Sequence, residues 1–113
     1  MVLPTNLKHI ATQEEHAKVI SESENVMVCC GRMGPMCIPV YEVMEELQDD
    51  YPNVDFRDMM FDSPEAAVIR NLPEARSFMG LPFVIYYKNG EVVAAKSSIQ
   101  SRDMITEVLD KVF

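Results

Sequence analysis

The sequence predicts an α/β fold in which helices flank a central mixed sheet of about four to five strands. Two observations predict it. Up to about residue 73, short apolar runs alternate with segments of helical periodicity, which is typical of parallel strands joined by right-handed crossovers. Farther on, Asn89 and Gly90 separate two apolar runs, and Asn-Gly is the strongest short signal of an antiparallel hairpin. A chain of 113 residues that is 48% apolar suits one compact domain over residues 1–113.

The first three predicted elements are a strand, a helix and a second strand. Residues 7–10 form the first short apolar stretch. Thr12 follows, with Glu15 at the third position after it, and this pair predicts a capping box that opens a helix reaching about residue 21. Residues 26–30 are a continuous apolar run closed by a glycine, which is typical of a strand buried on both faces. We therefore expect this second strand to lie in the middle of the sheet.

The second helix is predicted after the pair Gly34-Pro35. Pro35 suits the first helical position, where the N–H that proline lacks would have no partner. Pro39, one turn later, is expected to leave a carbonyl unpaired and to bend the helix. The apolar residues at helical spacing are Val40, Met44, Leu47 and Tyr51. The acidic residues interpreted as the solvated face are Glu45, Glu46, Asp49 and Asp50.

The rest of the chain predicts a strand, a short helix, a hairpin and a last helix. Residues 54–61 favour a strand, and residues 62–65 begin a helix that the asparagine and proline at 71 and 73 keep short or broken. Residues 81–87 and 91–95 are the two strands of the hairpin. Ser101 caps the last helix. The residues expected on its apolar face are Met104, Ile105, Val108, Leu109 and Val112.

Charge and hydropathy limit the classes of partner. The net charge is -8, and Lys and Arg do not cluster, so nucleic acid and anionic membranes are disfavoured and a protein or peptide with a basic or apolar surface is expected. No apolar run approaches the roughly 20 residues that span a bilayer, and the first residues do not resemble a secretory signal. We expect a cytoplasmic protein that carries no cofactor.

Two segments resemble the thioredoxin superfamily. Residues 26–47 (VMVCCGRMGPMCIPVYEVMEEL) resemble its central strand, active-site loop and long helix, and residues 78–96 (FMGLPFVIYYKNGEVVAAK) resemble its cis-proline, strand and hairpin. The resemblance implies that Pro82 is the cis-proline, and that Met33 and Met36 stand where the family has its two redox cysteines. Other positions also differ from the family. Arg32 stands where the family has a tryptophan, Met27 where it has a buried acid, and Asp58 where it has the lysine next to that acid. Phe83 and Ser98 replace smaller residues.

These replacements favour a binding function over the family's chemistry. A thioether has no acidic proton and forms no disulfide, so dithiol exchange cannot run through Met33 and Met36. The leading hypothesis is a redox-silent module that holds an extended peptide or a partner loop beside Pro82. The residues expected to bind it are Met33, Gly34, Pro35, Met36, Leu81, Pro82 and Phe83.

Two alternatives stay open. In one, the protein is a divergent thiol-disulfide oxidoreductase that uses Cys37, with or without Cys30. We expect Cys37 to be the most reactive thiol, because the first turn of a helix favours a thiolate, and Cys29 and Cys30 to be inert residues of a strand. In the other, Met33, Met36 and Cys37 form a soft-ligand site for Cu(I). His9 and His16 lack the spacing of a metal site and are interpreted as surface residues.

Overall fold

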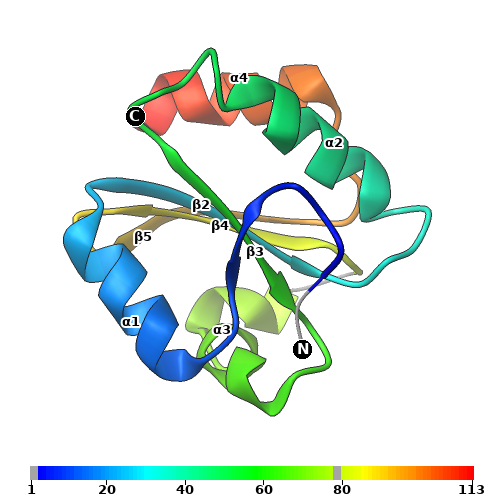
Figure 1. The fold of residues 1–113 in the computed structure, drawn as a ribbon, viewed down its shortest axis with the longest axis vertical. Coiled ribbons are helices and arrows are strands. Elements are labelled where there is room, and N and C mark those ends of the chain that lie inside the picture. Colours follow the sequence, from blue (N-terminus) through cyan, green and yellow to red (C-terminus); the bar gives the residue numbers. More distant parts are fainter. Residues whose placement is uncertain (1–2, 78–79) are drawn as a thin grey trace.

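The computed structural model describes residues 3–77 and 80–113, and it confirms the predicted α/β fold (Figure 1). A five-stranded mixed sheet has the order β1-β3-β2-β4-β5, in which β1, β3 and β2 run parallel and β4 and β5 run antiparallel to their neighbours. The strands are β1 (Lys8–Ile10), β2 (Asn25–Gly31), β3 (Asp55–Met60), β4 (Phe83–Lys88) and β5 (Glu91–Ser97). The sheet order places β2 in the centre, as its apolar sequence predicts.

Helices cover both faces of the sheet. Figure 1 shows α2 and α4 on one face and α1 and α3 on the other. The α-helices are α1 (Gln13–Glu22), α2 (Ile38–Leu47), α3 (Ala67–Arg70) and α4 (Arg102–Val112), and the 3₁₀ turns are η1 (Pro64–Ala66) and η2 (Pro73–Ser77). The connection after β3 is therefore short and broken, as expected. Of the segment 78–96, Phe78 and Met79 lie outside the described residues.

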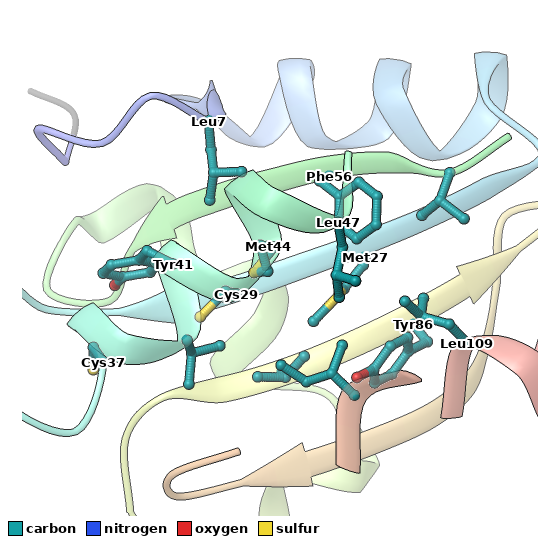
Figure 2. Close-up of a cluster of buried hydrophobic side chains, with 14 of the residues drawn as sticks. Leu7, Met27, Cys29, Cys37, Tyr41, Met44, Leu47, Phe56, Tyr86 and Leu109 are labelled. Atoms are coloured by element: carbon teal, nitrogen blue, oxygen red, sulfur yellow. The ribbon is translucent and has the colours of Figure 1, made fainter. Parts of the chain in front are cut away.

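Two hydrophobic clusters hold these layers together, one on each face of the sheet. All residues of β2 are buried, and because side chains alternate along a strand, its apolar side chains are divided between the clusters. Met27 and Cys29 pack in the cluster that contains the α2 residue Met44, whereas Val28 and Cys30 pack in the other cluster. Figure 2 shows the first cluster, with the α2 residues Tyr41, Met44 and Leu47 among side chains of the strands.

Local capping signals are confirmed with small differences. The Thr12 hydroxyl accepts a hydrogen bond from the Glu15 backbone N–H at 3.1 Å, while the Glu15 carboxylate accepts one from the Ala11 N–H at 2.6 Å, one residue before the cap. Ser101 caps α4 through the Met104 N–H at 3.2 Å. Met104 does not lie on the apolar face as predicted: it is 46% exposed, because its thioether turns back toward the Ser101 N–H instead of the sheet.

The start of α2 differs from the prediction. The helix begins at Ile38, and Pro35 belongs to the preceding turn, in which the N–H groups of Cys37 and Ile38 both bond to the Gly34 carbonyl. Pro39 has no N–H to donate to Pro35, so the regular helical ladder starts only at the next residues, whose N–H groups bond to the Cys37 carbonyl. Pro39 thus lies in the first turn of the helix and not one turn inside it.

His16 and His9 are not surface residues as the sequence suggested. His16 is 7% exposed, and its Nε2 lies 2.9 Å from the Tyr87 hydroxyl on the neighbouring sheet face. His9 is partly buried, with its Nδ1 2.7 Å from the Asp58 carboxylate. Periodicity could not reveal either contact, because each joins residues far apart in the sequence. Burial lowers the pKa of His16 below its usual value of 6.5.

The lowered pKa of His16 predicts that acidification destabilises the fold. Below about pH 6.5 the unfolded chain binds a proton on His16 that the folded protein still excludes, so the free energy of unfolding should fall as the pH is lowered from about 7 to 5. In His16→Gln, which keeps a polar partner for Tyr87 but does not titrate, the fall over this window should be smaller. Urea unfolding at a series of pH values measures the difference. Parallel pH curves for the two proteins would contradict it.

Candidate functional site

The candidate site lies where β2 ends and the loop to α2 begins. Gly31 permits a close approach there: a Cβ at this position would lie 2.7 Å from the Tyr41 hydroxyl and 2.8 Å from the Cys37 Sγ. The Tyr41 hydroxyl donates a hydrogen bond to the Arg32 carbonyl at 3.0 Å, and the Arg32 N–H donates one to the Cys37 Sγ at 3.4 Å. The first turn of α2 is therefore held directly against the end of the central strand.

A groove of about 480 Å³ opens beside this loop. Its walls come from the loop and the start of α2, from the end of β3 and from the segment before β4. The lining residues are Arg32, Gly34, Pro35, Met36, Cys37, Phe61, Gly80 and Leu81. Most of these side chains are apolar, and the volume falls within the range of small-ligand and side-chain pockets.

The structure brings together most of the predicted binding residues. Four of them, Gly34, Pro35, Met36 and Leu81, line the groove. Met33 is 44% exposed on the loop but does not line the groove. Pro82 is buried behind the groove, where the Leu81–Pro82 bond is cis and the proline Cβ would lie 3.3 Å from a Cβ at Gly31.

Phe83 is a correction to the predicted set. It is 3% exposed and packs in the hydrophobic cluster on the face of α1 and α3, so it contributes to the core and not to the groove. The reason is the start of β4 at this residue, because alternation along the strand then turns the Phe83 side chain toward that cluster.

One wall of the groove was not predicted. The Phe61 ring follows β3, with the Arg32 guanidinium 5.5 Å and the Arg70 guanidinium 5.8 Å from its centroid. Arg32 also makes a forked ion pair with Asp62, at 2.7 Å and 2.8 Å, which holds the pKa of Asp62 below its usual value. The sequence signal that could have revealed this wall is the parallel pairing of β3 with β2, since parallel neighbours end at the same edge of the sheet.

Comparison with solved structures identifies the fold of the chain. No family model matches the sequence, and no curated protein is significantly similar to it. Among solved structures, a Plasmodium falciparum thioredoxin matches with a TM-score of 0.77 and 23% identity over 95% of this chain and all of that chain. The chain has the thioredoxin fold. Mitochondrial thioredoxin 3 from Saccharomyces cerevisiae is also similar, with a TM-score of 0.73 and 17% identity over 92% of this chain and 94% of that chain. A Malassezia sympodialis thioredoxin matches with a TM-score of 0.74 and 15% identity over 98% of this chain and 94% of that chain.

Within this thioredoxin fold, the two candidate thiols Cys30 and Cys37 lie on opposite faces of the sheet. Cys30 packs in the cluster between the sheet and helices α1 and α3. Cys37 packs in the cluster between the sheet and α2 (Figure 2). This arrangement does not favour the Cys30–Cys37 disulfide that the sequence left open. Cys29 is the residue of β2 that shares a cluster with Cys37, because β2 is two-faced and the register sets which cysteine points toward α2.

The three thiols differ in their access to the groove. Cys29 and Cys30 are fully buried, and burial raises the pKa of Cys29 and raises that of Cys30 to about 12. Cys37 is also buried, at 3% exposure, but it lies at the N-cap of α2 and lines the groove. All three are free cysteines. Cys37 is thus the thiol that a reagent entering the groove meets.

We expect Cys37 to be alkylated first. Iodoacetamide should label Cys37 slowly in the native protein and reach Cys29 and Cys30 only after denaturation, because these two are buried in the sheet with raised pKa values. Peptide mass spectrometry after labelling at several pH values measures the order. In Cys37→Ser, native labelling should disappear. Labelling of Cys29 or Cys30 in the native protein, or of Cys37 only in denaturant, would contradict the assignment.

A buried carboxylate lies beside the site and was not predicted to be there. Asp58 is 1% exposed, and it accepts hydrogen bonds from the Thr5 hydroxyl and pairs with His9. Burial raises the pKa of Asp58, while Thr5 and His9 oppose this shift. Asp58 pairs with Cys29 in the β2–β3 register, so the thioredoxin fold here has an acid at the position where the resemblance implied a lysine.

Within residues 3–77 and 80–113, no group of three or more His, Cys, Asp or Glu side chains could hold a metal ion. Met33 and Met36 are exposed whereas Cys37 is buried, and Cu(I) binding by these three sulfurs stays a prediction. Among the described helices, none is long and apolar enough to cross a membrane.

Proposed function

We infer that this protein is a redox-silent binding module that holds an extended apolar peptide in the groove beside the β2–α2 loop. The observation that carries this proposal is the groove itself, with about 480 Å³ of space and mostly apolar walls. Apolar walls with a few polar groups are typical of sites that bury a ligand side chain. The groove lies at the end of the sheet in a fold shared with thioredoxins.

The groove walls combine rigid and adaptable parts. The hydrogen bonds of Tyr41 and Cys37 to the Arg32 backbone hold the start of α2 against the end of β2, so this wall is formed before a partner arrives. Met36, in contrast, is 44% exposed, and an unbranched thioether side chain adapts to differently shaped partners. A rigid floor with an adaptable rim supports binding of apolar side chains of more than one shape.

Charge supports a neutral or basic partner. The protein carries a net charge of -8, and the cation nearest the groove, Arg32, is already paired with Asp62 at 2.7 Å. An acidic peptide would meet long-range repulsion from the net negative charge. A peptide with an apolar residue between lysines meets long-range attraction and fills the groove with its apolar side chain.

The proposed test is titration of the ¹⁵N-labelled protein with short cysteine-free peptides that carry one leucine or phenylalanine flanked by lysines. Backbone amide signals of residues 32–34, 36–37 and 80–81 should shift, and peptides with glutamate flanks should bind more weakly. Met36→Asp should lower the affinity at least about tenfold, because it places a charge in the apolar wall. Met104→Asp is the matched control, since Met104 is 46% exposed on α4 and does not line this groove, and it should leave the affinity unchanged.

Three outcomes would overturn the proposal. The first is an absence of shifts in the groove with every peptide, and the second is an equal loss of affinity in Met36→Asp and Met104→Asp. The third is reduction of insulin disulfides at a rate comparable to that of a thioredoxin, because Met33 and Met36 hold no thiol and such turnover would require Cys37 to act as a nucleophile.

A further inference from the structure

Apart from the partly buried Met60, the described methionines are either fully buried or well exposed. In the described part of the chain, the fully buried methionines are Met27, Met44 and Met59, and those exposed by more than two fifths are Met33, Met36 and Met104. Two of the three exposed thioethers therefore lie on the β2–α2 loop. Met36 lines the groove, and Met33 lies three residues before it on the same loop.

Exposed thioethers react with peroxides, and the product differs from methionine in polarity. The methionine sulfur donates an electron pair to one oxygen of hydrogen peroxide, the O–O bond breaks, an S–O bond forms, and water leaves after proton transfer. The sulfur loses two electrons, and the peroxide is reduced. The resulting sulfoxide is polar, and methionine sulfoxide reductases return it to the thioether.

We propose that Met36, together with Met33, is a reversible oxidation site through which peroxide lowers the affinity of the groove for peptides. This regulation rests on the proposed function. A sulfoxide on Met36 adds a strong hydrogen-bond acceptor to a wall whose neighbouring side chains, Pro35 and Leu81, have no donor to offer. The Arg32 nitrogens Nε and Nη2 are already bonded to Asp62. An apolar side chain of a partner would then have to displace water from the sulfoxide oxygen without replacing its hydrogen bonds.

Burial makes this oxidation selective. Met27, Met44 and Met59 are at most 1% exposed, so peroxide reaches them only when the protein unfolds. Met104 is as exposed as the loop methionines, at 46%, but it lies on α4 away from this groove. Met104 is therefore a control: an effect of oxidation that depends on Met33 and Met36 but not on Met104 comes from the loop beside the groove and not from the protein surface in general.

The test is a titration of the full chain with hydrogen peroxide, with peptide mass spectrometry to follow each methionine. Met33, Met36 and Met104 should become sulfoxides before Met27, Met44 and Met59. Affinity for the lysine-flanked leucine peptide, measured before and after oxidation, should fall at least about tenfold in the natural sequence and recover with a sulfoxide reductase. In Met33→Leu/Met36→Leu, oxidation at the same dose should leave that variant's own affinity unchanged, whereas Met104→Leu should lose affinity on oxidation like the natural sequence.

A second probe keeps this test separate from the proposed function. The apolar dye ANS needs no peptide, and its binding to the groove should fall on oxidation of the natural sequence but not of Met33→Leu/Met36→Leu. If the unoxidised protein binds no peptide but the dye shows this difference, the proposed function fails and the oxidation site remains. Complete oxidation of Met36 with unchanged peptide and dye binding, or an equal loss in the double variant, would overturn the oxidation site.

Discussion

Gly31→Ala should lower the free energy of unfolding by about 2 kcal/mol, because it adds a methyl group where the core has no room for one. The new Cβ would lie 2.7 Å from the Tyr41 hydroxyl and 2.8 Å from the Cys37 Sγ. Both side chains are buried, and the Tyr41 hydroxyl is bonded to the Arg32 carbonyl, so neither can move aside without breaking other contacts. Urea unfolding followed by circular dichroism measures the change.

Gly34→Ala is the matched control for this substitution. Gly34 lies on the same loop, but among the described residues, its two chain neighbours aside, no atom lies within 4 Å of the position its Cβ would take. Its effect on the free energy of unfolding should stay within about 0.5 kcal/mol. Equal effects of the two substitutions would show that the close approach of α2 to the end of β2 does not require a glycine at position 31. Because Cys37 lines the groove, Gly31→Ala should also weaken binding of the lysine-flanked peptide.

Met44→Ala should lower the free energy of unfolding by about 3 kcal/mol. Met44 is 0% exposed, and its side chain packs in the hydrophobic cluster between α2 and the sheet that Figure 2 shows. Removing the thioether chain costs its burial free energy and leaves a cavity that the surrounding helix and strands can only partly fill. The same unfolding measurement applies, together with thermal unfolding.

The matched substitution for Met44 is Met104→Ala. The same atoms are removed there from a side chain that is 46% exposed, so the loss should stay within about 0.5 kcal/mol. Similar losses at the two positions would mean that the division of the methionines into core and surface residues is wrong.

Features that depend on a few neighbouring residues could be predicted from the sequence. The hairpin turn needs residues that tolerate positive φ, and Asn89 and Gly90 have φ values of 53° and 82°. Thr12 and Ser101 cap their helices through N–H groups three residues ahead. The start of α2 was misplaced because Pro35 and Pro39 each suit a first turn, and only the observed hydrogen bonds of the Gly34 and Cys37 carbonyls decide between them.

The sequence by itself determined the order of the strands and helices, the central place of β2 and the presence of thioethers on the β2–α2 loop, because local periodicity, capping and residue chemistry carry this information. Only the tertiary structure decided that Phe61 forms a groove wall, that Phe83 belongs to the core and that Cys30 faces away from Cys37. It also decided that His16 is buried against Tyr87. These outcomes depend on strand register and on contacts between residues distant in the sequence, and a one-residue change of register would send each strand side chain to the opposite face.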